Sequence, residues 1–454
     1  MVIQAGGRPA PCLFFLTETH PMPLSHFLKL YPWPENHEQM LAYSTRRGSY
    51  ALLPGQLVTA LQQGQAVPPD TVALLEKLNF VTADRKQEKE DIFSFNQRLN
   101  RLSTVLSLAV IINMDCNFQC RYCYEGTQKD KLYMTDRTAD QVVAFITERT
   151  VPQIKKVILD FYGGEPLLSS KRIISLAAAL QPGLQDRGVV LELTLVTNGS
   201  LLTPRVVNEL RPWGLTGCKV TLDGPAHNHN AFRPFKNGAP SYDLIVRNIK
   251  DCCELTRIGI GGNFTKDNYQ LFPQLLDDLE EQGLTPDKLA MVKFDPVQQT
   301  TDMYADLKFC GGCASIEEPW LAEASLLLRE EVLKRGYHTP KISPTPCMVD
   351  MENSFTIHYD GTLFKCVGMI GHQEYACGDI WSGIKDYRSQ YHLDQWQKEE
   401  KCRECVYLPL CFGGCRFMAF QRDGHMAKVD CRQDYLDATL EAMLLQDVRY
   451  RHPA

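Results

Sequence analysis

The sequence lacks the features that mark membrane, secreted and nucleic-acid-binding proteins. No apolar run is long enough to span a bilayer. The first residues, Met1 to Gln4, carry no basic segment, and the apolar run at 12–16 is too short for a signal-peptide core. Lys and Arg number 48 against 54 Asp and Glu, for a net charge of −6, so we expect no nucleic-acid partner. These absences predict a cytoplasmic protein without a membrane partner.

Cysteine, in contrast, is abundant. The 454 residues include 17 cysteines, and most of them lie after Lys308. Thiols stay reduced in the cytoplasm, so a disulfide framework does not explain this number. The count instead predicts bound metal, concentrated in the C-terminal part of the chain.

A compact group of cysteines follows the apolar run 106–112. Cys116, Cys120 and Cys123 are spaced C-x3-C-x2-C. Three thiolates on one short loop can hold three irons of a [4Fe–4S] cluster, which leaves the fourth iron open to a small molecule. A structural zinc ion takes four ligands, so it fits this group less well.

Between residues 95 and 300, apolar strand patterns alternate with amphipathic helices, which predicts βαβ units and a parallel sheet. In a parallel barrel the chemistry lies at the carboxyl ends of the strands. The expected strands are 107–113, 156–162, 192–197, 219–223, 259–264 and 290–294. The expected helices include 136–149, 171–180, 204–210, 242–255 and 269–282.

Polar and glycine residues stand at the ends of these strands. After the second strand come Gly163, Gly164, Glu165 and Pro166, where glycines let the backbone approach a ligand and the carboxylate can face an ammonium group. The next three strands end near short polar side chains that suit ribose hydroxyls and a carboxylate, or that act only as helix N-caps. These residues are Thr197, Asn198, Asp223 and Asn263. Arg233, in the loop after the fourth strand, can pair with a carboxylate or form a surface salt bridge.

The C-terminal cysteines have their own spacing. Cys347, Gly361 and Cys366 form C-x13-G-x4-C, and a later group forms C-x2-C-x5-C-x3-C before a final Cys431. Seven thiols at these intervals predict two metal centres, either iron–sulfur clusters or a pair of zinc sites. The later group is Cys402, Cys405, Cys411 and Cys415.

The N-terminal part reads as strands at 27–31, 40–44 and 49–53, followed by three helices, the last reaching about residue 101. Three strands followed by three helices resemble a known winged-helix-like peptide-recognition domain. The alternatives are a structural cap and a DNA-binding winged helix. The acidic balance argues against DNA.

Three of these motifs together resemble a known family. The loop of Cys116, Cys120 and Cys123, with Tyr122 before the last cysteine, resembles the C-x3-C-x-aromatic-C motif of radical S-adenosylmethionine (SAM) enzymes. The Gly-Gly-Glu-Pro segment resembles their SAM-binding motif, and the seven C-terminal cysteines resemble a SPASM domain. The resemblance implies an α/β fold: a leader-peptide recognition domain at 1–94, a partial (β/α)6 barrel at 95–300 and a SPASM domain at 301–454.

The resemblance also implies cofactors and their ligands. One [4Fe–4S] cluster binds SAM, and two auxiliary [4Fe–4S] clusters lie in the SPASM domain. By the family's interleaved pattern, Cys347, Cys366 and Cys415 hold the first auxiliary cluster. The second is held by Cys402, Cys405, Cys411 and Cys431. The first therefore lacks one ligand, which is Cys310 or Cys313, less favourably Cys377, or a cysteine of the substrate. The SAM-binding candidates are Tyr122, Gly163, Gly164, Glu165, Pro166, Thr197, Asn198, Asp223 and Asn263.

The implied activity is hydrogen abstraction from a ribosomally made, leader-bearing peptide by a 5′-deoxyadenosyl radical, with flavodoxin or ferredoxin as electron donor. The chain most resembles the geopeptide-type maturases, which act on cysteine-containing precursors. Sulfatase-maturing relatives have an acidic residue after the cysteine matching Cys366, as a base, and here that residue is Val367. This difference favours Cys thioether formation, with no side-chain base assigned. The alternatives are sulfatase-type Cys or Ser oxidation, carbon–carbon crosslinking, epimerisation and, outside enzymes, an iron–sulfur electron carrier.

Overall fold

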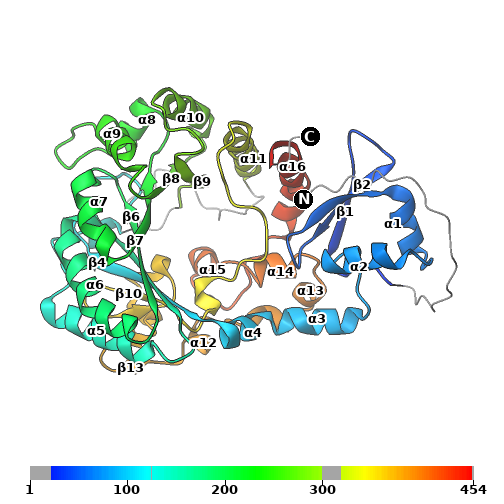
Figure 1. Ribbon diagram of the computed structural model, residues 1–454, viewed down its shortest axis with the longest axis horizontal. Helices are drawn as coiled ribbons and strands as arrows, with labels where there is room; N and C mark the ends of the chain where they lie inside the picture. The colour runs from blue at the N-terminus through cyan, green and yellow to red at the C-terminus, as the bar shows by residue number, and fades with distance from the viewer. Residues whose placement is uncertain (1–21, 124, 299–317, 452–454) are drawn as a thin grey trace.

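A computed structural model describes residues 22–123, 125–298 and 318–451 (Figure 1). Its centre is an eight-stranded sheet in the order β11-β10-β4-β5-β6-β7-β8-β9. The run from β4 to β9 is parallel throughout, which confirms the predicted α/β fold with a parallel sheet. These strands are β4 (Val105–Asn113), β5 (Lys156–Gly163), β6 (Val190–Thr197), β7 (Leu215–Thr221), β8 (Arg257–Phe264) and β9 (Leu289–Pro296).

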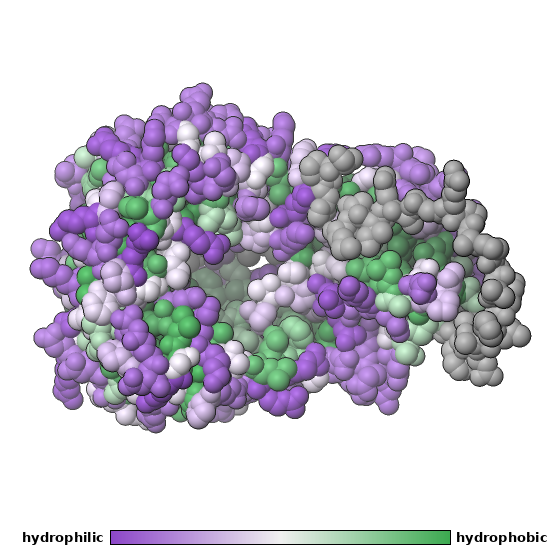
Figure 2. Space-filling model, in the orientation of Figure 1, coloured by the Kyte–Doolittle hydropathy of each residue, from purple (hydrophilic) through white to green (hydrophobic). Residues whose placement is uncertain are grey.

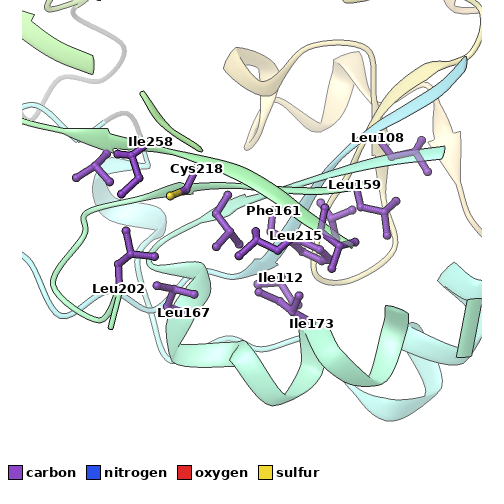
Figure 3. Packing of buried hydrophobic residues seen from close by; sticks show 14 of the residues in the cluster. Leu108, Ile112, Leu159, Phe161, Leu167, Ile173, Leu202, Leu215, Cys218 and Ile258 are labelled. Atoms are coloured by element: carbon purple, nitrogen blue, oxygen red, sulfur yellow. The ribbon is translucent and has the colours of Figure 1, made fainter. Parts of the chain in front are cut away.

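Helices cover one face of this sheet. Alternate residues of β4, such as Leu108 and Ile112, point to that face and are almost fully buried, as period-two alternation requires. Leu159 and Phe161 of β5 pack there with Ile173 of a crossover helix (Figure 3). The helices are α5 (Asp136–Arg149), α6 (Ser170–Gln185), α7 (Pro204–Leu210), α8 (Ala226–Phe232), α9 (Tyr242–Cys252) and α10 (Phe272–Glu281).

The sheet extends beyond the six predicted strands. A C-terminal hairpin, β10 (Ser354–Ile357) and β11 (Leu363–Phe364), turns at Gly361, whose φ is +91°. β10 pairs in parallel with β4, from Ser354 opposite Ser107 to Ile357 opposite Val110. The C-terminal region is therefore joined by backbone hydrogen bonds to the strand that leads into the cysteine loop.

The N-terminal part forms a separate antiparallel sheet, β1 (Leu28–Pro32), β2 (Gln39–Ser44) and β3 (Tyr50–Pro54). The expected third helix is broken at Ser94, where it forms α3 (Arg85–Phe93) and α4 (Phe95–Leu102). Asp84 caps α3 by accepting hydrogen bonds from two backbone N–H groups of its first turn. One face of this sheet is covered by α1 (Gly55–Gln62) and α2 (Pro69–Lys77).

The other face of the N-terminal sheet packs on the C-terminal region. Trp33 and Tyr43 are buried against α16 (Gln433–Arg451), which also packs beside α11 (Pro319–Lys334). The shorter C-terminal elements are β12 (Gly378–Asp379), β13 (Gly383–Ile384), α12 (Tyr387–Gln390), α13 (Glu400–Arg403), α14 (Leu408–Cys411) and α15 (Arg416–Asp423). Figure 2 shows a hollow with apolar residues near the middle of the visible face. No helix among the described residues has the length and apolar composition needed to cross a membrane.

Candidate functional site

The cysteine loop follows β4, and Cys116 and Cys120 in it are buried. Its backbone is tied to the segment after β5: the N–H of Gly164 donates to Asn113 O at 3.1 Å, and that of Glu165 to Asp115 O at 2.7 Å. A Cβ on Gly164 would lie 1.9 Å from Asp115 O. The glycine therefore permits the close approach of two protein loops.

The three thiols of the loop share one cation. Burial raises the pKa of Cys116 to about 11, and the ammonium of Lys129 opposes this rise. Burial lowers the pKa of Lys129, but the Cys123, Cys116 and Cys120 sulfurs outweigh it, so the pKa of this lysine is raised. The sulfurs thus face a common space with a positive charge beside it. Sequence reasoning missed Lys129, because spacing does not show which later residue folds back onto the loop.

The side chain of Glu165 links the ends of β5 and β6. Its side chain is fully buried, and its Oε1 accepts hydrogen bonds from Thr197 Oγ1 at 2.7 Å and from Leu167 N at 3.0 Å. Its Oε2 accepts from the backbone N–H of Asn198 at 2.8 Å. Burial raises the pKa of Glu165, and these hydrogen bonds oppose the rise. The carboxylate is thus engaged with protein donors, and Pro166 beside it is also buried.

Asn198 connects this unit to the cysteine loop. Its Nδ2 donates to Asn117 Oδ1 at 2.8 Å and lies 3.8 Å from the sulfur of Cys116. The candidates Glu165, Thr197 and Asn198 are therefore brought together beside the first cysteine.

The remaining candidates form a second buried network. The hydroxyl of Tyr122 donates to Asp223 Oδ2 and accepts from Arg233 Nη1 at 2.7 Å and from Asn263 Nδ2 at 3.0 Å. Asp223 Oδ1 accepts from the backbone N–H of Asn263 at 2.7 Å. Arg233 lies 3.9 Å from Asp223, and its side chain is only 12% exposed, so this is not a surface salt bridge. Burial raises the pKa of Asp223, and Arg233 opposes this rise.

His229 supports this network through hydrogen bonds to Asp223 and Ser241. Its Nδ1 accepts from the backbone N–H of Asp223, and its Nε2 donates to Ser241 Oγ, both at 3.1 Å. Ser241 Oγ in turn donates to the carbonyl of Arg233 at 2.7 Å. Burial, aided by Arg233, lowers the pKa of His229 well below its usual value. The histidine is therefore neutral with its proton on Nε2, a role that no sequence motif indicated.

The open face of the sheet carries further polar residues that sequence reasoning missed. Asp160 of β5 accepts a hydrogen bond from Thr194 Oγ1 of β6 at 2.7 Å. Lys219 of β7 lies over Gly261 of β8, where a Cβ would meet its Cε at 2.3 Å. Strand alternation places these side chains opposite the helix-covered core, so assigning the two faces of each strand in advance would have found them.

The site offers what a carboxylate-bearing cofactor needs. Nε of Arg233 is buried without a hydrogen-bond partner among the described residues. A free guanidinium N–H close enough to the Cys120 sulfur for the two charges to interact suits the carboxylate of a bound amino acid moiety. No three His, Cys, Asp or Glu side chains in the described part converge as ligands of a single metal ion. In a [4Fe–4S] cluster each thiolate binds a different iron, so ligands spread around a shared space also fit that group.

The C-terminal cysteines lie in two groups. Burial raises the pKa of Cys366 to about 12, and the Cys415 and Cys347 sulfurs raise it further, so these three lie together. The other group lines one small cavity and comprises Cys402, Cys405, Cys411 and Cys431. Cys310 and Cys313 lie outside the described residues. Cys377 is buried beside Lys365 and Arg149, and these cations oppose the rise that burial causes in its pKa.

The first C-terminal group approaches the cysteine loop of the barrel. Val367 and Ile370, just after Cys366, pack in an apolar cluster with Ile111 and Met114 at the end of β4. Gly371 lies against the side chain of Gln128, where a Cβ would be 1.9 Å from Nε2. The two cysteine groups therefore border the same region, and the side chain beside Cys366 there is apolar.

Comparison with known proteins identifies relatives of this chain. The model of the Radical SAM superfamily matches residues 110–281. A serine-type anaerobic sulfatase-maturating enzyme of Bacteroides thetaiotaomicron is 32% identical over 353 residues, covering 68% of this chain and 81% of the relative. An AdoMet-dependent heme synthase of Nitratidesulfovibrio vulgaris is 24% identical over 341 residues, covering 70% and 89%.

The fold is similar to that of Streptococcus suis SuiB bound to precursor peptide SuiA, with a TM-score of 0.52 and 14% identity. The match covers 90% of this chain and 99% of the other. The chain therefore belongs to the radical SAM superfamily and is related to its anaerobic sulfatase-maturating enzymes.

Proposed function

We propose that this radical SAM enzyme is a maturase that installs Cys thioether crosslinks in a ribosomally made, leader-bearing precursor peptide, as geopeptide-type maturases are expected to do. The observation that carries the choice of bond is Val367. It stands beside Cys366 in apolar contact with Ile111 and Met114, where sulfatase-maturing relatives have an acidic base. Dehydrogenation loses its base at this position. A substrate thiolate bound to a metal is activated without one.

The barrel residues receive roles in this proposal. Cys116, Cys120 and Cys123 hold a [4Fe–4S] cluster whose open iron takes SAM. When bound, the cluster and SAM supply a 5′-deoxyadenosyl radical for hydrogen abstraction. Arg233, through its free Nε, takes the carboxylate of SAM, while Asn263 and Asp223 orient that arginine together with Tyr122. Glu165, with Thr197 and Asn198, fixes the loops that form the SAM pocket around Gly163, Gly164 and Pro166.

The C-terminal cysteines hold two auxiliary [4Fe–4S] clusters in this account. Cys347, Cys366 and Cys415 supply three ligands of the first, and Cys402, Cys405, Cys411 and Cys431 all four of the second. The fourth position of the first cluster is taken by Cys310 or Cys313, or it stays open to a cysteine of the substrate. Flavodoxin or ferredoxin supplies the electron that starts the reaction in the cytoplasm.

The N-terminal sheet is the proposed leader-binding element. β1 and β3 are its edge strands, and both of its faces are covered by other parts of the chain. A peptide can therefore add to it only along an edge, by main-chain hydrogen bonds. The precursor peptide bound in the SuiB structure supports a peptide partner for this fold.

The second candidate is sulfatase-type oxidation of a Cys or Ser residue, which the 32% identity with a sulfatase-maturating enzyme favours. Carbon–carbon crosslinking and epimerisation are other outcomes of the same hydrogen abstraction.

One experiment separates these products. The reconstituted protein is given SAM, a reductant and the cysteine-containing peptide encoded beside its gene, and the peptide is weighed before and after thiol alkylation. We expect a loss of about two mass units for each cysteine that becomes resistant to alkylation, as a thioether requires. The same loss with every thiol still alkylated would refute the thioether and indicate Ser oxidation or a carbon–carbon bond. Oxidation of a Cys to the aldehyde would instead remove about 18 mass units and one thiol. SAM cleavage with no mass change would indicate epimerisation.

A further inference from the structure

The segment from Cys402 to Phe412 makes contacts on two sides. One side carries Cys402, Cys405 and Cys411, which line a cavity with Cys431. The other side is the surface on which the N-terminal domain rests. The metal centre and the peptide-recognition domain therefore share one short stretch of chain.

Polar contacts join this segment to the N-terminal domain. Thr45 Oγ1, fully buried, donates to the carbonyl of Val406 at 2.6 Å. The ring of His26 lies 3.1 Å from the carbonyl of Glu404, and the carboxylate of Glu404 pairs with Lys89. Two of these contacts are to backbone carbonyls, so they depend on the path of the main chain between the cysteines.

Apolar contacts follow the same path. Phe27 of the N-terminal domain is fully buried in a cluster with Cys402, Leu408 and Phe412. The ring of Phe95 stacks on that of Phe412, with centroids 5.4 Å apart and planes at 6°. A metal ligand is thus itself part of the interdomain core.

The segment has little structure of its own to hold this shape. Its helices, α13 and α14, are four residues each, too short to be stable alone. Phe412 has a φ of +42°, in the left-handed region that a bulky side chain rarely adopts. Cys431 lies two residues before α16, the helix against which Trp33, just after β1, and Tyr43 of β2 are buried. These two contact surfaces of the N-terminal domain therefore start from ligands of the same centre. A third contact, from the Tyr43 hydroxyl to the carbonyl of Ile342 at 2.8 Å, does not involve this centre.

We propose that the metal centre of Cys402, Cys405, Cys411 and Cys431 is the anchor of the N-terminal domain, so that its loading docks the peptide-recognition sheet and its loss releases it. Metal binding that fixes several chain segments contributes its free energy to their folding. The inference rests on the proposed cluster ligation and adds a function that electron transfer alone does not require.

The first auxiliary group supplies a matched control. Cys366 and Cys415 pack against the barrel core, a cluster whose buried members all follow residue 105. Neither cysteine belongs to the apolar clusters that hold the N-terminal domain, so replacing these two leaves those clusters in place.

The test compares full-length, reconstituted protein with the double variants Cys402→Ser/Cys405→Ser and Cys366→Ser/Cys415→Ser by hydrogen exchange. The reporter is the 25–54 region, which includes the amide of Thr45 that donates to Phe27 O at 2.9 Å. We expect at least tenfold faster exchange there in the first variant and little change in the second. Equal exchange in both variants, or none above wild type, would overturn the proposal.

The reverse effect is tested without touching a cysteine, in case the first variant does not fold. Coupling between two sites is reciprocal, so Thr45→Val and Lys89→Met should speed the release of iron to a chelator by several-fold. Release at the wild-type rate would contradict the anchor. Iron sufficient for only one cluster in the wild type would overturn the proposed ligation as well. A full iron content in the wild type, with no faster hydrogen exchange in Cys402→Ser/Cys405→Ser, would overturn the proposed anchor but not the proposed ligation. Neither readout uses SAM cleavage.

Discussion

At the scale of single residues, the site is built from buried polar groups that satisfy one another. Tyr122, Asp223 and Asn263 meet Arg233 in a volume almost closed to water. A buried ion pair adds little stability by itself, but removing one member leaves the other charge uncompensated. The network therefore fixes geometry beside the cysteine loop rather than strengthening the fold.

This reasoning gives the first prediction. Arg233→Met should lower the free energy of unfolding by about 3 kcal/mol, because Asp223 loses its cation in a buried setting. Urea unfolding of the metal-free protein measures this change. Arg205→Met is the control, since the side chain of Arg205 is 80% exposed and its change should stay within about 0.5 kcal/mol. Equal effects of the two substitutions would contradict the buried pair.

The second prediction concerns pH. His229 is neutral in the folded protein because burial and Arg233 lower its pKa, whereas an unfolded histidine titrates near about 6.5. Below that pH the unfolded chain binds a proton at this histidine and the folded protein does not. The free energy of unfolding therefore falls as the pH drops from about 6.5.

Replacement of His229 should reduce the dependence of the unfolding free energy on pH. In His229→Gln, the slope of unfolding free energy against pH below about 6.5 should flatten by up to about 1.4 kcal/mol per unit. The same substitution at the exposed His425 should leave the slope unchanged. An unaltered slope in His229→Gln would show that another group causes the acid sensitivity.

At the scale of elements, the cysteine loop and the segment after β5 form one unit. Gly163 and Gly164 are required there by neighbouring backbone: a Cβ at Gly163 would lie 2.3 Å from Asn113 O, and the φ of this residue is +123°. A shift of either loop would move the thiols that follow Asp115.

The third prediction follows from this contact. Gly164→Ala should displace the cysteine loop, so less than half of the wild-type iron at the first cluster should remain after reconstitution. Iron analysis combined with electron paramagnetic resonance measures it. Gly183→Ala is the control, because no atom lies within 4 Å of a Cβ there and the residue is helical. That change should stabilise α6 by about 0.5–1 kcal/mol. Full iron in Gly164→Ala would refute the predicted displacement.

Sequence patterns predicted the elements well where the signal was local. The six parallel strands follow from alternating apolar runs, and the carboxyl strand ends do bring Thr197, Asn198, Asp223 and Asn263 near the cysteine loop. The pairing of β10 with β4 was not predictable, because a four-residue strand some 240 positions away carries no local signal of its partner. Lys129 and His229 were missed for the same reason: their roles depend on how loops fold back in space.

At the scale of the whole molecule, the N-terminal sheet, the barrel and the C-terminal region are joined by two sets of contacts. β10 joins the C-terminal region to the barrel, and the segment after Cys402 joins it to the N-terminal sheet. A group of cysteines lies beside each of these two sets of contacts. The cysteine-rich region therefore connects the N-terminal sheet to the barrel.

The central claim is that the cysteine loop of the barrel generates a radical that takes hydrogen from a peptide. The measurement uses the precursor peptide with deuterium on the α-carbons and side chains of its core residues and follows the mass of the 5′-deoxyadenosine released. We expect deuterium in that nucleoside, in an amount matching the modified peptide, and loss of both in Cys120→Ala. A modified peptide with unlabelled 5′-deoxyadenosine, or label transfer that persists in Cys120→Ala, would contradict it.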